Sequence, residues 1–143
     1  MNQDRRKHKR FPVLENIAKS IELFIPEKSS YGLPAILLDL SRSGVGLLTF
    51  TPIKVGTILN IDIDLIELHI HNLKGKVVWM KNIQQTYRIG VKFLEIEEKI
   101  AKKIDKIAQD YTDCEIKLSL GVKDVCFKKC NYYTLCNKKY KLP

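Results

Sequence analysis

Hydrophobic and polar residues alternate along much of the first two thirds of the chain. Between positions 18 and 25, Ile21, Leu23 and Ile25 fall on one side of an extended chain, opposite Glu22. A period of two predicts a β-strand with one buried face. The same reasoning predicts further strands, separated by turns and with a break near His71-Asn72, at 35–40, 45–50, 57–65, 68–80 and 87–94. Six short strands of this kind indicate a small antiparallel barrel or sandwich.

The hydrophobic period changes to three and four residues after the last predicted strand. The apolar side chains that recur there, with charged residues between them, are Ile96, Ile100, Ile104, Ile107 and Tyr111. This spacing predicts an amphipathic helix over about 95–111. Glutamates enrich its first turn, where they suit the positive end of the helix dipole. We expect the apolar face of the helix to pack on the strands.

The net charge of +9 is concentrated at the two ends of the chain. Residues 1–10 carry a net charge of +4 and residues 122–143 carry +5, whereas residues 11–121 are neutral. The first ten residues include one apolar side chain, Met1, so we expect this segment to be mobile until something binds it. Nucleic-acid-binding proteins more often carry their charge on a folded face, so nucleic acid is not the expected partner.

These patterns divide the chain into four parts. The expected parts are a basic N-terminal switch segment, a barrel, a helix and a small basic Cys-rich tail, at 1–10, 11–95, 95–111 and 112–143. No run of about 18 or more uncharged apolar residues occurs, so the sequence predicts no transmembrane helix. The basic segment lacks a following apolar h-region, which argues against a secretory signal and indicates a cytoplasmic protein.

The sequence contains no recognisable catalytic arrangement. We find no Ser/His/Asp or Cys/His constellation, no glycine-rich loop that would cradle a phosphate, and no pair of carboxylates at a plausible site. The sequence therefore predicts a protein that is not an enzyme.

Two short motifs combine residue types suited to binding a nucleotide. Arg6 and Arg10 form an Arg-x-x-x-Arg pattern, and Asp39, Ser41 and Gly44 form Asp-x-Ser-x-x-Gly on a predicted turn. Each motif alone has a simpler explanation. Short basic runs are often solvated tails, and Asp, Ser and Gly are ordinary turn formers.

The two motifs together, in this order and on a pattern of six strands, resemble the PilZ domain, the bacterial receptor domain for cyclic di-GMP. The strand that contains Trp79 and the closing Gly90-Val91-x-Phe93 strand extend the resemblance, which covers about residues 5–95. It implies a mainly β fold, a six-stranded antiparallel barrel followed by a C-terminal α-helix.

The resemblance also implies which residues bind cyclic di-GMP: Arg5, Arg6, Arg10, Asp39, Ser41 and Gly44. Guanidinium groups bind phosphate bidentately and stack on flat rings, which suits the two motif arginines to clamp phosphates and guanines. Asp39 can accept N–H donors from a guanine edge, and Ser41 adds a compact hydroxyl. Gly44 permits a tight turn and close approach of the ligand. An arginine at position 5 implies a stacked pair of ligands, and therefore two per chain.

The function implied is that of a cyclic di-GMP effector or adaptor. Ligand binding would order residues 1–10 and regulate a protein partner, whose identity the sequence does not reveal, in motility, exopolysaccharide production or a similar process. The alternative is a nucleic-acid-binding or redox-sensing adaptor that uses the basic ends and a metal-bound tail.

Four cysteines lie in the last thirty residues or so of the chain. Cys114, Cys126, Cys130 and Cys136 are separated by 11, 3 and 5 residues. Because cytoplasmic proteins seldom keep disulfides, such a set points to zinc or an iron–sulfur cluster. The segment from Cys130 to Cys136 resembles the terminal cysteine segment of RecB-like iron–sulfur nucleases, although the preceding pair there is normally separated by two residues. Four separate reduced thiols are the alternative.

Overall fold

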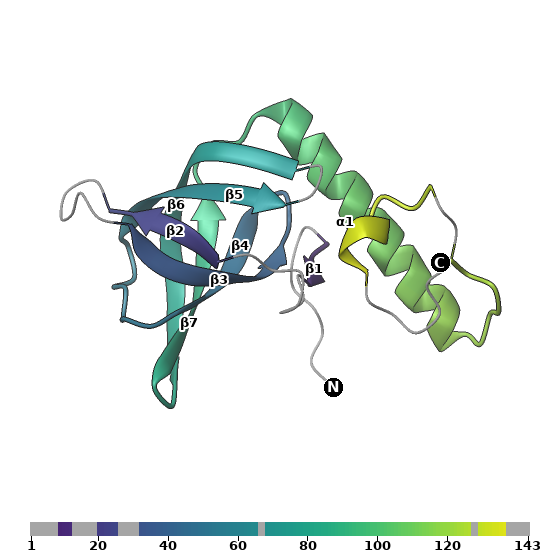
Figure 1. Ribbon diagram of the computed structural model, residues 1–143, viewed down its shortest axis with the longest axis horizontal. Helices are drawn as coiled ribbons and strands as arrows, with labels where there is room; N and C mark the ends of the chain where they lie inside the picture. The colour runs from purple at the N-terminus through teal and green to yellow at the C-terminus, as the bar shows by residue number, and fades with distance from the viewer. Residues whose placement is uncertain (1–8, 13–19, 26–31, 66–67, 127–128, 137–143) are drawn as a thin grey trace.

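The computed structural model describes residues 9–12, 20–25, 32–65, 68–126 and 129–136, and most of them belong to one β-barrel with a helix at its end (Figure 1). The strands are β1 (Phe11–Pro12), β2 (Ser20–Phe24), β3 (Leu33–Leu40), β4 (Gly44–Thr49), β5 (Ile58–Leu65), β6 (Leu68–Ile83) and β7 (Thr86–Phe93). Strands β2 to β7 close an antiparallel barrel in the order β3-β2-β5-β6-β7-β4, with β4 pairing back to β3. The prediction of a six-stranded antiparallel barrel with a C-terminal helix is confirmed.

Alternation of side chains places the core inside the barrel. In β5, Leu59, Ile61, Ile63 and Leu65 are buried, whereas the intervening aspartates are exposed. The break predicted near His71-Asn72 is a β-bulge, where β6 uses three steps to pass two steps of β5. Asn72 takes a positive φ of 57° there, and its N–H donates to Asp62 Oδ1 at 2.7 Å.

Helix α1 (Glu98–Ser119) packs a stripe of apolar residues on the barrel core. It begins three residues later and ends eight residues later than the predicted 95–111. The helix continues beyond Tyr111 because Cys114 and Leu118, both partly buried, extend the apolar spacing of three and four residues. The prediction therefore ended the helix too early. A short 3-10 helix, η1 (Tyr133–Leu135), follows in the C-terminal segment.

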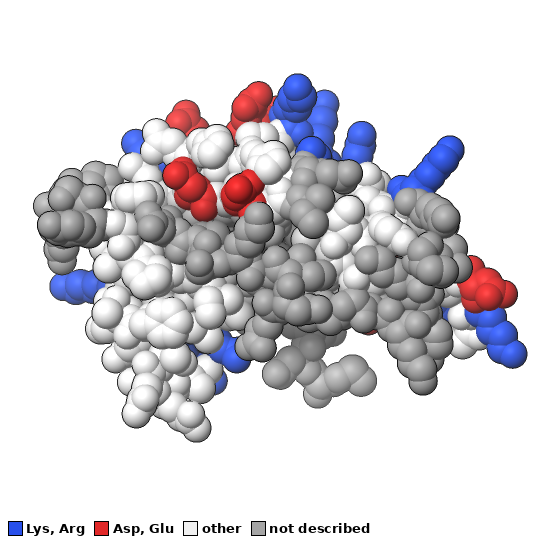
Figure 2. Space-filling model, in the orientation of Figure 1, with Lys and Arg blue, Asp and Glu red and all other residues white. Residues whose placement is uncertain are grey.

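Two observations bear on the predicted class of protein. Acidic and basic side chains are both exposed on the face seen in Figure 2, as expected for a neutral barrel and helix. Among the residues that the structure describes, no helix is long and apolar enough to cross a membrane.

Candidate ligand-binding site

Four paired positions form a row across the outer face of the barrel. Asp39 of β3 pairs with Gly46 of β4, Gly46 pairs with Gly90 of β7, and Gly90 pairs with Trp79 of β6. Directly paired residues point to the same face of a sheet. Because the Trp79 side chain is 43% exposed, this is the outer face. We call these four residues the outer row.

The two glycines make room for the two side chains at the ends of the outer row. A Cβ at Gly46 would lie 2.8 and 2.9 Å from the carboxylate oxygens of Asp39. A Cβ at Gly90 would overlap the indole of Trp79. The carboxylate and the indole therefore lie against bare backbone, at opposite ends of the outer row.

Asp39 and Trp79, at the two ends of the outer row, point outward because a β-bulge precedes each of them. The pairing shifts between Leu37 and Asp39, and again between Val77 and Trp79. Leu37 and Leu40 are both fully buried although they are three residues apart, which shows the change of phase in β3. Without the extra residue, Asp39 and Trp79 would point into the core.

Arg10 lies next to Asp39 because of the short strand that follows it. Phe11 and Pro12 of β1 pair with Leu40 and Asp39 at the end of β3, outside the barrel. Arg10 Nη1 is 3.6 Å from Asp39 Oδ1, which makes an ion pair that is too long for a hydrogen bond. The side chains of Arg10 and Asp39 are 26% and 33% exposed.

The ion pair leaves two polar atoms unsatisfied. Arg10 Nε and Asp39 Oδ1 are buried, and neither has a hydrogen-bond partner within the residues described. Buried polar atoms in folded proteins are nearly always hydrogen-bonded. Here a cationic donor and an anionic acceptor stand next to each other with bonding capacity unused. Because both side chains are also partly exposed, their accessible atoms can bind a ligand that carries both acceptors and donors.

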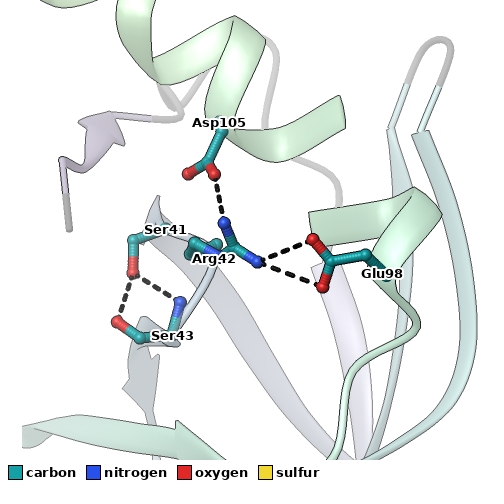
Figure 3. A network of polar contacts seen from close by, with 5 residues as sticks. All are labelled: Ser41, Arg42, Ser43, Glu98 and Asp105. Carbon is teal, nitrogen blue, oxygen red and sulfur yellow. Dashed lines mark hydrogen bonds and ion pairs between the residues drawn. The ribbon is translucent and has the colours of Figure 1, made fainter. Parts of the chain in front are cut away.

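The Asp-x-Ser-x-x-Gly motif forms the turn between β3 and β4. Ser41 is fully buried, and its hydroxyl oxygen accepts from the N–H groups of Ser43 and Gly44 at 3.2 Å each. It also lies 3.1 Å from the hydroxyl of Ser43. Figure 3 shows this contact within the turn. A Cβ at Gly44 would overlap the carbonyl of Val91 on β7. Both residues therefore shape the turn, and their contact with a ligand stays a prediction.

Arg42, within the same turn, ties the motif to α1 (Figure 3). Its Nη1 donates to Asp105 Oδ2 at 2.7 Å, and its Nη2 donates to both oxygens of Glu98 at 3.2 and 3.3 Å. The negative charge of Asp105, followed by the hydrogen bonds to Glu98, raises the pKa of Arg42 above its ordinary value. Sequence reasoning missed this link. The available signal was the spacing of Glu98 and Asp105, seven residues apart on one face of a helix.

The structure thus brings together Arg10, Asp39, Ser41 and Gly44, four of the six predicted ligand residues. Arg5 and Arg6 lie outside the described residues. Gly46, Gly90 and Trp79 were not predicted as part of the site. Their common row depends on strand pairing and two bulges, which no local sequence pattern reveals.

Cys114 lies on α1, the other three cysteines lie in the chain that follows it, and none of the four forms a disulfide. No group of three His, Cys, Asp or Glu side chains that could hold a metal ion occurs within the part of the chain that the structure describes. The predicted zinc or iron–sulfur site therefore has no structural support. Burial is the main cause that raises the pKa of Cys130, so this thiol keeps its proton at neutral pH.

Comparison with known proteins gives one family and several solved structures. The PilZ domain family model matches residues 4–109. No curated protein sequence matches the chain. YcgR from Escherichia coli, solved in complex with c-di-GMP, is similar with a TM-score of 0.61 and 15% identity, over 82% of this chain and 50% of that chain.

Two further structures have the same fold. The PilZ domain of Escherichia coli YcgR with c-di-GMP gives a TM-score of 0.57 and 16% identity, over 82% of this chain and 98% of that chain. The inhibitor of motility MotI (DgrA) of Bacillus subtilis gives a TM-score of 0.60 and 13% identity, over 85% of this chain and 54% of that chain. The matched region spans about half the length of the YcgR and MotI chains.

The family match covers most of the chain and includes Arg6, Arg10 and the Asp39–Gly44 turn. The structural neighbours share the fold of this chain, which is a closed barrel. PilZ domains are non-enzymatic receptors for cyclic di-GMP, and this confirms that the chain is not an enzyme. The chain belongs to the PilZ domain family.

Proposed function

We propose that this chain binds cyclic di-GMP at the Arg10–Asp39 end of the outer row and acts as an adaptor. The observation that carries this proposal is the partly exposed ion pair of Arg10 and Asp39, in which a buried atom of each side chain also lacks a hydrogen-bond partner. A guanidinium donor suits a phosphodiester oxygen or the O6/N7 edge of guanine. A carboxylate suits the N–H donors of guanine. Membership of the PilZ family and the c-di-GMP named with YcgR support the same ligand.

Trp79 gives the outer row a second type of ligand contact. Its indole is 43% exposed and lies beyond Gly46 and Gly90 as seen from Asp39. An exposed aromatic ring can stack on a purine, and such stacking adds to the hydrogen bonds made by charged groups. We include Trp79 in the proposed site on this ground.

Arg5 and Arg6 complete the proposed site by the family pattern. Arg6 would share the phosphate and guanine contacts with Arg10, since the two stand four residues apart. Arg5, just before the motif, would favour a stacked pair of ligands and therefore two molecules per chain. The positive charge of this segment would also attract the dianionic ligand from a distance.

Calorimetric titration of the full chain with cyclic di-GMP tests the proposal. We expect saturable binding at two ligands per chain, lost in Arg10→Ala and in Asp39→Ala and retained in the control Lys141→Ala. The absence of binding to the unmodified chain would refute the proposed function. Saturation at one ligand would refute only the stoichiometry. Parallel titrations with cyclic di-AMP and a DNA oligonucleotide separate guanine recognition from general attraction of anions to the basic ends.

The adaptor role requires that ligand binding changes the surface offered to a protein partner. We propose that cyclic di-GMP further orders the segment 1–10 against the barrel, adding to the contacts that Lys9 and Arg10 already make with Gln109 and Asp39, in a process such as motility or exopolysaccharide production. Hydrogen exchange of this segment, with and without ligand, measures the change. Equal exchange in both states would rule out the mechanism even if the ligand binds.

A further inference from the structure

Strand β1 lies between the barrel and the C-terminal segment 129–136, which includes η1 (Figure 1). β1 has two residues, and its pairings are Phe11 with Leu40 and Pro12 with Asp39. Two residues paired to one neighbour are too few to hold a strand by backbone hydrogen bonds alone. Phe11 is nevertheless fully buried. Contacts outside the barrel must therefore contribute to its position.

Tyr132 supplies the most direct of these contacts. Its ring is 3% exposed and meets the ring of Phe11 edge to face, with centroids 5.8 Å apart. It also meets Tyr111 of α1 at 4.9 Å. The Tyr132 hydroxyl donates to the backbone carbonyl of Pro12 at 2.7 Å. Burial is the main cause that raises the pKa of Tyr132, so the phenol stays protonated and remains a donor.

The C-terminal segment is itself fastened to α1. The backbone N–H and the side-chain amide of Asn131 both donate to Asp110 Oδ2, at 2.6 and 2.9 Å. Leu135 is 2% exposed and belongs to the core. Just before β1 in the sequence, Lys9 Nζ donates to Gln109 Oε1 of α1 at 3.0 Å. The helix, the segment 129–136 and the residues around Arg10 therefore form one packed unit.

We propose that residues 129–136 act as a C-terminal clasp that positions Arg10 for the ligand, with Tyr132 as the positioning residue. This role rests on the proposed function. Phe11 and Pro12 follow Arg10 directly, so the contacts that fix them also fix the backbone of Arg10 beside Asp39. A receptor whose arginine is already in place loses less entropy on binding and has a higher affinity.

The first experiment needs no ligand. Hydrogen exchange of the Arg10 and Phe11 amides is compared in the unmodified chain and in three variants. Tyr132→Ala should speed their exchange about tenfold or more, and Tyr132→Phe should speed it less. Tyr87→Phe, which removes the same hydroxyl from a ring on β7, should leave it unchanged. Unchanged exchange in Tyr132→Ala would overturn the clasp, whether or not the chain binds cyclic di-GMP.

The second experiment measures affinity for cyclic di-GMP in the same variants. Loss of one hydrogen bond in Tyr132→Phe should weaken binding about fivefold, and loss of the ring in Tyr132→Ala should weaken it more. Asp110→Ala, which releases the clasp from α1, should also weaken binding. Circular dichroism confirms that each barrel is folded. Equal affinity in all variants, or equal loss in Tyr132→Phe and Tyr87→Phe, would overturn the positioning role.

A third measurement separates positioning from a purely structural role. By thermodynamic linkage, a clasp that raises ligand affinity is stabilised by the ligand to the same degree. Cyclic di-GMP should therefore slow hydrogen exchange in residues 129–136, and Arg10→Ala should remove the effect. Slowed exchange near Asp39 without any change in 129–136 would contradict the coupling. If the unmodified chain binds no cyclic di-GMP, the proposed function fails. The ligand-free experiment still decides whether residues 129–136 hold Arg10 and Phe11 in place.

Discussion

At the scale of single residues, the candidate site depends on two absent side chains as much as on those present. Gly46 leaves space for the Asp39 carboxylate, and Gly90 leaves space for the Trp79 indole. Neither glycine adopts a positive φ, so both are required by the close approach of a side chain and not by backbone conformation. This distinguishes them from Gly56, whose φ is 95°.

Gly46→Ala should lower affinity for cyclic di-GMP while leaving the barrel folded. The new Cβ would stand 2.8 Å from Asp39 Oδ2, so the carboxylate must leave its position beside Arg10. The expected loss is about tenfold or more, the order of one charge-assisted hydrogen bond. Calorimetry measures the affinity, with the exposed β6 variant Asn82→Ala as control. An alanine variant that binds as tightly as the control would show that the carboxylate does not contact the ligand.

At the scale of elements, the short segments are held by their neighbours and not by their own hydrogen bonds. β1 is covered by Tyr132, and the turn after β3 is tied to α1 through Arg42. Within the clasp, burial raises the pKa of Cys130, so folding favours the protonated thiol. This contribution to stability is fully present below the ordinary pKa of 9.0 and is lost as the pH rises through the higher pKa of the folded state.

Cys130 should therefore react slowly with iodoacetamide in the folded protein. The thiolate is the reactive form, so the pH at which alkylation reaches half its maximal rate should lie above 9.0 when the protein is folded. In concentrated guanidinium chloride the midpoint should return to the ordinary value. Mass spectrometry of the Cys130 peptide gives the rates. A folded-state midpoint at or below the unfolded one would contradict the burial of this thiol.

At the scale of the whole molecule, the barrel, α1 and the clasp meet around Arg10. The neutral region 11–121 carries the fold, and the net charge of +9 lies at the ends. One of these ends supplies Arg10 to the proposed site, and the other supplies Tyr132, which contacts the strand next to it. Ligand binding at this site should therefore raise the free energy of unfolding of the entire domain.

Cyclic di-GMP should raise the midpoint of thermal unfolding. A ligand at 100 times its Kd stabilises the native state by about 2.7 kcal/mol, which for a chain of this size corresponds to roughly 5–10 °C. The rise should disappear in Arg10→Ala, and it should persist in Lys141→Ala, which removes a positive charge outside the two motifs. Differential scanning calorimetry gives the midpoints. An equal rise in Arg10→Ala would separate the stabilisation from the proposed site.

The sequence by itself determined the six strands of the barrel, the amphipathic face of the helix and the two motifs, but not strand β1. These are local properties, because a period of two or of three to four residues records which side of an element is buried. The tertiary structure alone decided that Asp39 and Trp79 point outward, since each direction depends on a bulge set by pairing with another strand. It also decided that Tyr132 lies on β1, a contact between residues 120 positions apart. Contacts of this kind arise from the packing of the complete chain, and no local pattern encodes them.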